Sequence, residues 1–237
     1  MVEAGEARPN RVTFITALGA CSNLHDLEEG RKIHRYIDRY EEEERSDVLV
    51  ATALINMYGK CGSVEDAREI FQGIPKRDVI AWNAIIAANA QLGHGKEALE
   101  LLQRMDLEGR MAWEGVQPSG VAFVSILAAC SHGGLLLPSR SYFLAMSGDH
   151  GIAPSMEHYG CVIDLLGRLG MMEELMDLIA AMPFEPGGIE WRNVLGACRT
   201  QSDVENGSDA AEIARELEPE HAAAYVMLFG LYSTEEP

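Results

Sequence analysis

The sequence predicts an all-α protein, a right-handed α-solenoid of stacked helix-turn-helix repeats. Three observations lead to this fold class. The chain resembles itself at several spacings, its segments carry apolar residues at helical intervals, and glycine or proline falls at regular places between them. A composition with 47% hydrophobic and 24% charged residues suits a folded chain of this kind.

Internal repetition is the strongest of these observations. A shift of 109 residues lays VTFITALGACS, from Val12, over VAFVSILAACS, from Val121, and a shift of 108 residues pairs Gly59 with Gly167. The tetrapeptide LGAC also occurs twice. Because a single helical hairpin cannot cover its own apolar face, repeats of this length are expected to stack on one another.

The segment that starts at Val48 shows the two-helix pattern of one repeat. VLVATALINMYGK is apolar at helical spacing, and Gly62 accepts the left-handed conformation that ends a helix. Ser63 is predicted to cap the second helix, with Asp66 in a capping-box-like position, and Pro75 closes the repeat.

The same pattern divides the chain into units of unequal length. Residues 1–10 are expected to end a truncated repeat, and 11–187 to form five full repeats. Extra residues around Glu41–Glu44 and Met111–Glu114 fall near unit ends, where an insertion extends a surface loop. The full repeats are 11–47 (long), 48–78 (short), 79–119 (standard), 120–155 (long) and 156–187 (short), followed by motifs at 188–221 and 222–237.

The amino-acid sequences of these units resemble the plant-type pentatricopeptide repeat family with mixed long and short motifs, the PLS subclass. The segments that carry the resemblance are EALELLQRM…GVQPS, ALINMYGKCGSVEDAREIFQGIPKRD, VAFVSILAACSHGGL and MEHYGCVIDLLGRLG. The order of long, short and standard units resembles the same subclass. The motif at 188–221 looks like the first E-type extension motif of that family, and 222–237 like the truncated start of the second.

The resemblance implies that each repeat reads one base of single-stranded RNA with its fifth and its last residue. These residues are Thr52 and Asp78 in one repeat, and Asn83 and Ser119 in the next. A carboxylate only accepts hydrogen bonds, so Asp78 suits a base with an N–H on its edge, guanine or uracil. Family usage pairs Thr–Asp with guanine and Asn–Ser with cytosine, which predicts a G-then-C preference from 5′ to 3′.

The remaining repeats are predicted to read bases less well. In two long repeats the fifth residue is apolar, and in the repeat at 156–187 Gly160 and Gly187 offer no side chain. The weaker pairs are Ile15 with Asp47 and Val124 with Ser155.

The second residue of a unit is expected to wedge between bases. Four units carry a branched apolar side chain there, and Glu157 departs from the pattern. Little RNA contact is therefore expected beyond the fourth full repeat. The wedging residues are Val12, Leu49, Ile80 and Val121.

The chain is predicted to lack a catalytic site, a metal and a cofactor. LGHGKEA contains a GxGxxA string, but a dinucleotide fingerprint needs a preceding strand, and the flanks here are helical. No HxE…PCxxC string of the zinc deaminases occurs. Three cysteines share the eleventh position of their units, which is typical of packing sites: Cys21, Cys130 and Cys198.

The formal net charge of −18 argues against non-specific binding of nucleic acid. Reading base edges by hydrogen bonds needs fewer cationic contacts than clamping phosphates, so the charge predicts weak rather than absent RNA binding. Much of the acid lies in outer segments such as Glu41–Glu44 and Glu212–Glu220. No run of about 18 apolar residues exists, so no membrane association is expected.

The resemblance implies RNA processing in a mitochondrion or chloroplast, including the specification of a cytidine for C-to-U editing. A deaminase would then lie downstream or be supplied in trans by a deaminase-bearing repeat protein or an accessory protein. The alternative is a helical scaffold that binds protein partners, which the acidic charge and the degenerate fifth positions after Gly120 favour.

Overall fold

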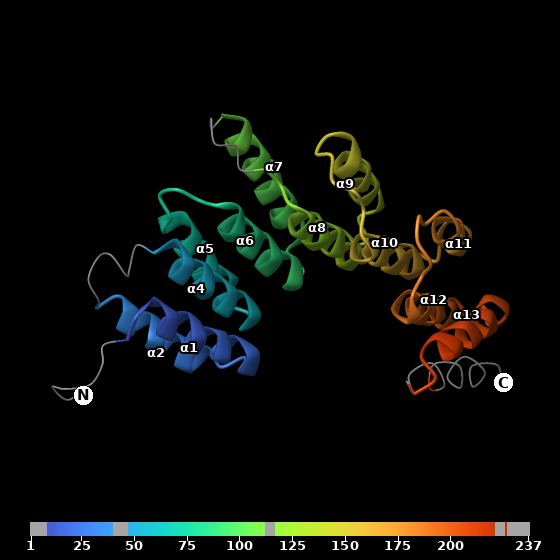
Figure 1. The fold of residues 1–237 in the computed structure, drawn as a ribbon, viewed down its shortest axis with the longest axis horizontal. Helices are drawn as coiled ribbons and strands as arrows, with labels where there is room; N and C mark the ends of the chain where they lie inside the picture. Colours follow the sequence, from blue (N-terminus) through green and yellow to red (C-terminus); the bar gives the residue numbers. More distant parts are fainter. Residues whose placement is uncertain (1–8, 40–46, 112–116, 221–225, 227–237) are drawn as a thin grey trace. The chain divides into compact units, whose positions relative to one another are not determined.

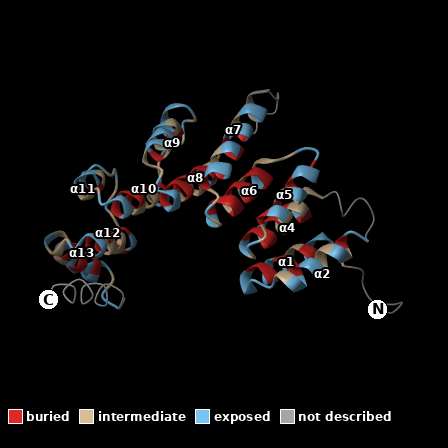
Figure 2. Cartoon of the chain, turned by 180° about the vertical axis from the view of Figure 1, so that it is seen from behind, coloured by how far each residue is buried: buried red, intermediate tan, exposed pale blue. Residues whose placement is uncertain are grey.

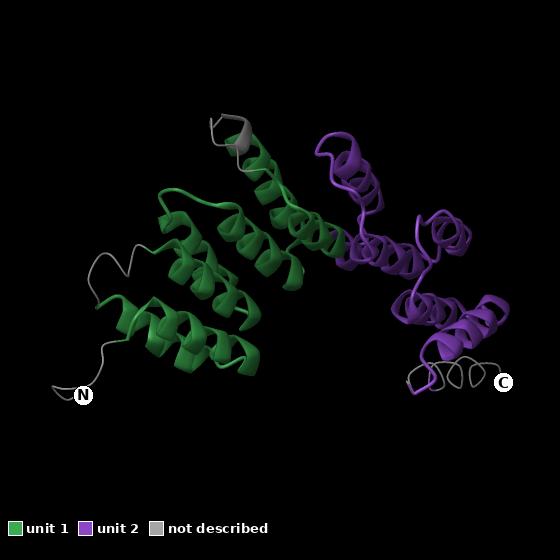
Figure 3. Ribbon diagram, in the orientation of Figure 1, with its two compact units in different colours: residues 1–129 green, residues 130–237 purple. Residues whose placement is uncertain are grey.

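A computed structural model describes residues 9–39, 47–111, 117–220 and 226, and over these residues the chain forms twelve α-helices and no strand (Figure 1). The chain divides into two compact units, residues 1–129 and 130–237 (Figure 3). The predicted all-α class of paired, stacked helices is therefore confirmed. None of the described helices is long and apolar enough to cross a membrane.

The first unit is a stack of helical hairpins (Figure 1). The first helix of each hairpin packs on the first helix of the next, and each second helix packs on the first helix of its own hairpin. Residues 120–129 of α8 (Gly120–Gly133) complete the unit. The first helices are α1 (Arg11–Leu24), α4 (Val48–Lys60) and α6 (Val79–Gln91), and the second helices are α2 (Leu27–Ile37), α5 (Val64–Gly73) and α7 (Gly95–Met111).

The second unit continues the pattern of paired helices. Helix α10 contacts α9, α11 and α12, and α12 packs along α13. Tyr159 joins the core between Phe143 and Phe184, with ring centroids 5.1 and 5.4 Å away. The helices are α9 (Leu136–Gly148), α10 (Met156–Leu169), α11 (Met172–Ala180), α12 (Gly188–Gln201) and α13 (Val204–Leu217).

Glycines in the left-handed region make the turns inside two hairpins. Gly62 follows α4 with φ of 82°, as the sequence predicts, and Gly93 follows α6 with φ of 79°. A side chain with a Cβ atom is strained at such angles, so glycine is favoured there. Since α6 precedes Gly93, the GxGxxA string is a helix-to-helix turn and follows no strand.

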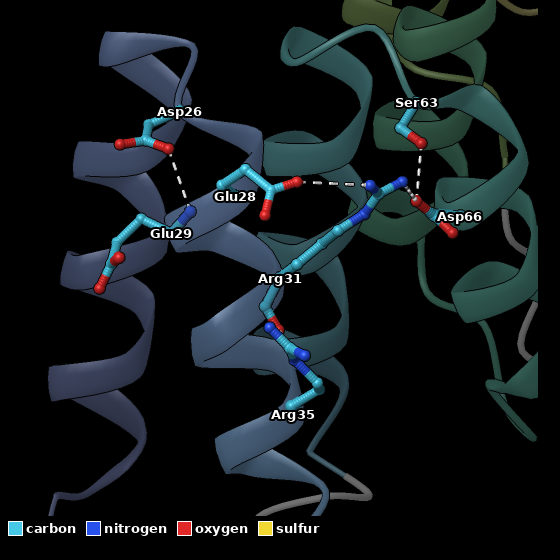
Figure 4. A network of polar contacts seen from close by, with 7 residues as sticks. All are labelled: Asp26, Glu28, Glu29, Arg31, Arg35, Ser63 and Asp66. Carbon is cyan, nitrogen blue, oxygen red and sulfur yellow. Dashed lines mark hydrogen bonds and ion pairs between the residues drawn. The ribbon is translucent and has the colours of Figure 1, made fainter.

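The predicted capping hydrogen bond of Ser63 is not formed. Ser63 occupies the N-cap of α5, but its side chain makes no bond to the helix backbone. Its Oγ instead donates to Asp66 Oδ2 at 2.6 Å, and the same oxygen accepts from Arg31 of α2 at 3.0 Å (Figure 4). The two donors, Ser63 first, lower the pKa of Asp66. The carboxylate thus joins two successive hairpins instead of completing a cap.

Close approach between first helices depends on glycine paired with alanine. A Cβ atom placed on Gly59 of α4 would lie 2.6 Å from the Cβ of Ala88 in α6. The same distance separates a Cβ on Gly167 of α10 from Ala197 in α12. Both glycines are twelfth in their units and both alanines tenth, so the repeated register produces the same contact twice.

The core of the first unit is centred on α6, which is buried along much of its length (Figure 2). Trp82 is fully buried and meets Phe71 edge-on, with ring centroids 4.7 Å apart. Large apolar side chains buried in this way contribute roughly 1.5–3 kcal/mol each. Packing of this helix therefore fixes the positions of its N-terminal residues, which belong to the predicted reading site.

Each predicted full repeat contains two helices, and the exact unit boundaries and length classes stay predictions. The acidic insertion at Glu41–Glu44 lies outside the described residues. Met111 ends α7, and the rest of the second insertion, through Glu114, is not described. The terminal segments 1–8 and 221–237, apart from residue 226, are likewise outside the described part.

Candidate RNA interface

The predicted wedging residues stand exposed in the first turn of successive first helices. Their exposed fractions run from 42% for Leu49 to 62% for Val121, which is high for branched apolar side chains. All four are second in their units, so their exposure recurs with the repeat register. The four side chains are Val12 (61%), Leu49, Ile80 (56%) and Val121.

The sequence prediction missed one residue of this kind. Ile189 is second in the unit at 188–221 and is 59% exposed at the start of α12. It could have been found by extending the second-position pattern past Glu157, which is exposed but charged. The apolar pattern therefore resumes after one interruption.

The last residue of each predicted repeat lies at the N-terminus of the next first helix, and both aspartates among them cap the helix backbone there. Asp78 Oδ1 accepts from the N–H of Ala81 at 2.8 Å, and Asp47 Oδ1 accepts from the N–H of Leu49 at 2.7 Å. Side-chain oxygens are favoured at this position because the first helical N–H groups have no partner inside the helix. The two predicted serine readers also lie here, at Ser119 and Ser155.

The second carboxylate oxygens of the two aspartates differ in their surroundings. Asp47 Oδ2 lies 3.7 Å from the Arg11 guanidinium. Asp78 Oδ2 makes no hydrogen bond or ion pair within the described part of the chain. Asp78 therefore keeps an acceptor that a ligand can use, whereas that of Asp47 faces a cation.

The predicted reader pair of the repeat at 79–119 is brought together. Asn83 Nδ2 donates to Ser119 Oγ at 2.9 Å, although the residues are 36 positions apart. Ser119 Oγ also accepts from the N–H of Ala122 at 3.4 Å. Asn83 Oδ1 is buried without a hydrogen-bond partner among the described residues, which leaves one strong acceptor at the site unsatisfied.

The other fifth-position residues offer fewer polar atoms than Asn83. Thr52 is 5% exposed, and its hydroxyl donates to the carbonyl of Val48 at 2.7 Å, which leaves the oxygen as an acceptor. Ile15 and Val124 are half-buried and offer no polar atom. Ser155, paired with Val124 by the prediction, has its hydroxyl 2.7 Å from His158 Nδ1.

The cysteine thiols of the described residues are held in a partly buried environment. Burial raises the pKa of the Cys130, Cys161 and Cys198 thiols to about 11, so these thiols are protonated near neutral pH. Burial is also the main cause of the raised pKa of Cys21. Within the described residues, no three histidine, cysteine, aspartate or glutamate side chains gather as metal ligands would.

Paired helices stacked first helix on first helix define the chain as a helical-repeat protein. Comparison with known families narrows the class: the model of the pentatricopeptide (PPR) repeat matches residues 50–79, 80–110 and 157–184. These three segments of the chain are therefore pentatricopeptide repeats.

Relatives of this kind match the chain over almost its whole length. The pentatricopeptide repeat-containing protein At5g48910 of Arabidopsis thaliana is 40% identical over 234 residues, which cover 99% of this chain and 35% of that protein. The protein CRR2, chloroplastic, of the same plant is 39% identical over 233 residues, 98% of this chain and 34% of its own length. The chain thus spans about a third of the curated relatives it matches.

A solved structure shares the fold. The crystal structure of the pentatricopeptide repeat protein PPR10, in complex with an 18-nt psaJ RNA element, superimposes with a TM-score of 0.67. The sequences are 16% identical, and the superposition covers 99% of this chain and 39% of that one. At this identity the likeness establishes the architecture.

Proposed function

We propose that this chain binds single-stranded RNA in a sequence-specific manner, through the N-terminal turns of its first helices. The observation that carries the proposal is the contact between Asn83 Nδ2 and Ser119 Oγ, which unites two residues predicted to read one base. The unsatisfied Asn83 Oδ1 beside it gives the pair an acceptor to offer a base. The likeness in fold to PPR10, whose crystal contains RNA, supports the same function.

Hydrogen-bond chemistry supports a G-then-C preference. At the first site, Thr52 and Asp78 offer acceptors only, which suits the N1–H and N2–H₂ donors on the edge of guanine. At the next site, the Asn83 carbonyl oxygen can accept from the N4 amino group of cytosine. The exposed apolar side chains at the second positions would stack against bases; Ile15, Asp47, Val124 and Ser155 would contribute less.

The finer assignment follows from the same reasoning. The unit order and the segments at 188–221 and 222–237 support a PLS-type protein with E-type extension motifs. Such a protein would specify a cytidine for editing in an organelle, with a deaminase supplied downstream or by a partner in trans. Relatives such as CRR2 carry the description chloroplastic, which supports a chloroplast or mitochondrion.

A protein-binding scaffold is the second candidate function, and one surface favours it. Leu137 and Leu144 of α9 are 77% and 70% exposed and lie seven residues apart, on the same face of the helix. With a net charge of −18, the chain would also attract basic protein partners.

Fluorescence anisotropy with short labelled RNAs tests the first function. An RNA with adjacent G and C should bind more tightly than its C–G swap by roughly five- to a hundredfold, since about 1–3 kcal/mol of hydrogen bonding is misplaced. Asn83→Ala should remove the preference at the second base alone. Gln91→Ala, an exposed change at the far end of α6, is the matched control and should change neither.

Two outcomes would contradict the proposal. Equal affinity for the original and the swapped RNA would exclude base reading by these pairs. No binding at about 50 mM salt, together with a co-purifying protein, would favour the scaffold, because electrostatic contributions to RNA binding are largest at low salt.

A further inference from the structure

Glu190 is a nearly buried carboxylate that no predicted site uses. It is third in α12 and 5% exposed, the same fraction as the predicted reader Thr52. Its Oε2 accepts from the N–H of Gly187 at 3.0 Å. Its Oε1 makes no hydrogen bond among the described residues, so the carboxylate keeps a free acceptor.

The carboxylate lies where the reader side chains of its repeat are missing. The repeat at 156–187 has glycine at both reading positions, Gly160 and Gly187. A Cβ atom on Gly187 would lie 3.1 Å from Glu190 Oε2, and one on Gly160 would lie 3.9 Å from Oε1. Glu190 therefore faces the positions that fifth and last side chains would occupy.

The repeat at 48–78 shows what this carboxylate replaces. There the last residue, Asp78, reaches forward and accepts from the N–H of Ala81, the third residue of the next helix. In α12 the direction is reversed, because the third residue, Glu190, reaches back to the N–H of the last residue, Gly187. Both helices thus begin with a carboxylate that accepts a backbone N–H in the first turn, from the last residue of the preceding repeat in α6 and from the third residue of the helix in α12.

We propose that Glu190 is the specificity-determining residue of the repeat at 156–187 and that it selects guanine; the inference rests on the proposed RNA binding. An ionised carboxylate only accepts, and guanine alone presents two adjacent donors, N1–H and N2–H₂. Adenine and cytosine place a ring acceptor beside their amino group, and uracil flanks its single N–H with two acceptors. Neither glycine places a side chain between Glu190 and a base, and Ile189, the preceding residue of α12, is 59% exposed.

The experiment varies one nucleotide. Since the repeats follow one another in chain order, the RNA is 5′-GCNX-3′ with constant flanks, and X is each of the four bases. Wild type should bind X = G about five- to tenfold more tightly than X = A. Glu190→Gln keeps an acceptor for the Gly187 N–H but replaces the free acceptor with a donor, so the preference for G should be lost while folding is kept.

Controls separate this inference from the proposed function. Glu205→Gln removes the same charge from an exposed site on α13 and should leave the preference intact. If wild type is indifferent to X but still distinguishes GC from the swapped CG, the Glu190 inference is overturned and the proposed function stands. If the swap has no effect either, the proposed function fails. A loss of G preference in Glu205→Gln would also overturn the inference, since net charge alone would then explain it.

Discussion

The pair of helices α4 and α6 and the pair α10 and α12 share one packing arrangement but carry different polar groups at their N-terminal turns. In both pairs the twelfth-position glycine of one helix faces the tenth-position alanine of the next. A Cβ atom built on the glycine would lie 2.6 Å from the Cβ atom of the alanine. At the N-terminal turn the first pair has Thr52 and Asp78, whereas the second has two glycines and Glu190. The same packing contact therefore occurs beside two different sets of polar groups.

The largest expected difference between the two regions concerns the fourth-position tryptophans. Trp82 in α6 is fully buried against Phe71, whereas Trp191 in α12 is half-buried. Trp82→Ala should lower the free energy of unfolding by about 3–5 kcal/mol. Trp191→Ala should lower it by less, because the half-buried side chain makes fewer contacts and its removal leaves a smaller cavity. Urea unfolding followed by circular dichroism measures both. Equal losses would mean that the two packings differ less than the burial indicates.

The glycine–alanine contacts should respond alike in the two regions. Gly59→Ala and Gly167→Ala each force a Cβ atom to 2.6 Å from its neighbour, which should cost about 1–3 kcal/mol through overpacking. Adding Ala88→Gly to the first variant, or Ala197→Gly to the second, removes the 2.6 Å contact and leaves a Cα atom at 3.2 or 3.6 Å. Each double variant should be more stable than the sum of its single effects predicts.

If the effects of the two substitutions in a pair simply add, the helices must move apart without cost. The glycine–alanine contact would then not limit the stability of that pair. Because repeat proteins gain stability from interfaces between neighbours, loss of one contact should also lower the cooperativity of unfolding. The slope of the urea transition reports this change.

Alkaline pH should weaken the second unit through its thiols. Burial raises the pKa of Cys130, Cys161 and Cys198 to about 11, against 9.0 for an unperturbed thiol. Between about pH 9 and 11 the unfolded chain loses these protons and the folded chain keeps them, so stability is full below pH 9 and falls as the pH rises.

The expected loss is on the order of 1 kcal/mol for each thiol. Cys198→Ala should lower stability at pH 8 through the lost packing, yet flatten the fall in melting temperature between pH 8.5 and 10.5. An unchanged slope would show that other groups dominate the alkaline transition. Tyr58, whose pKa burial raises to about 12, titrates later and serves as a reference in the first unit.

Register was the part of this molecule most accessible from the sequence. The 108-residue shift placed Gly59 and Gly167 at equivalent positions, and the structure gives them the same neighbour. The exposed second-position side chains followed from the same register. Periodicity captures these features because they recur at fixed positions in several units and depend mainly on backbone geometry.

Side-chain hydrogen bonds were less accessible because they depend on rotamers and on competing partners. The hydrogen bond between Asn83 and Ser119 joins residues 36 positions apart, and no local sequence pattern predicts it. The Ser63 hydroxyl donates to the Asp66 carboxylate and makes no bond to the helix backbone, since a charged acceptor forms the stronger hydrogen bond. The sequence did not predict the position of Glu190 beside Gly187, because Glu190 is the third residue of the following unit, where the family pattern assigns no reader.

The smallest expected effect concerns two aspartates that each accept from one serine and one arginine. Asp66 joins hairpins through Arg31 at 3.0 Å, whereas Asp164 receives Arg168 from its own helix at 2.9 Å and Ser131 from α8 at 2.5 Å. Asp66→Asn should cost about 0.2–1 kcal/mol at pH 7, since the pair is partly exposed.

Acid tests the contribution of Asp66, and salt distinguishes the two aspartates. The pKa of Asp66 is lowered in the fold, so its contribution is present above pH 4 and disappears as the pH falls below its ordinary value of 3.8. Wild type and Asp66→Asn should therefore converge in stability near pH 2. Raising salt to about 0.5 M should shrink the Asp66→Asn effect, because the arginine attraction is screened. The Asp164→Asn effect should persist in salt, because the hydrogen bond from Ser131 carries the link between helices; a parallel decline would show that Arg168 carries it instead.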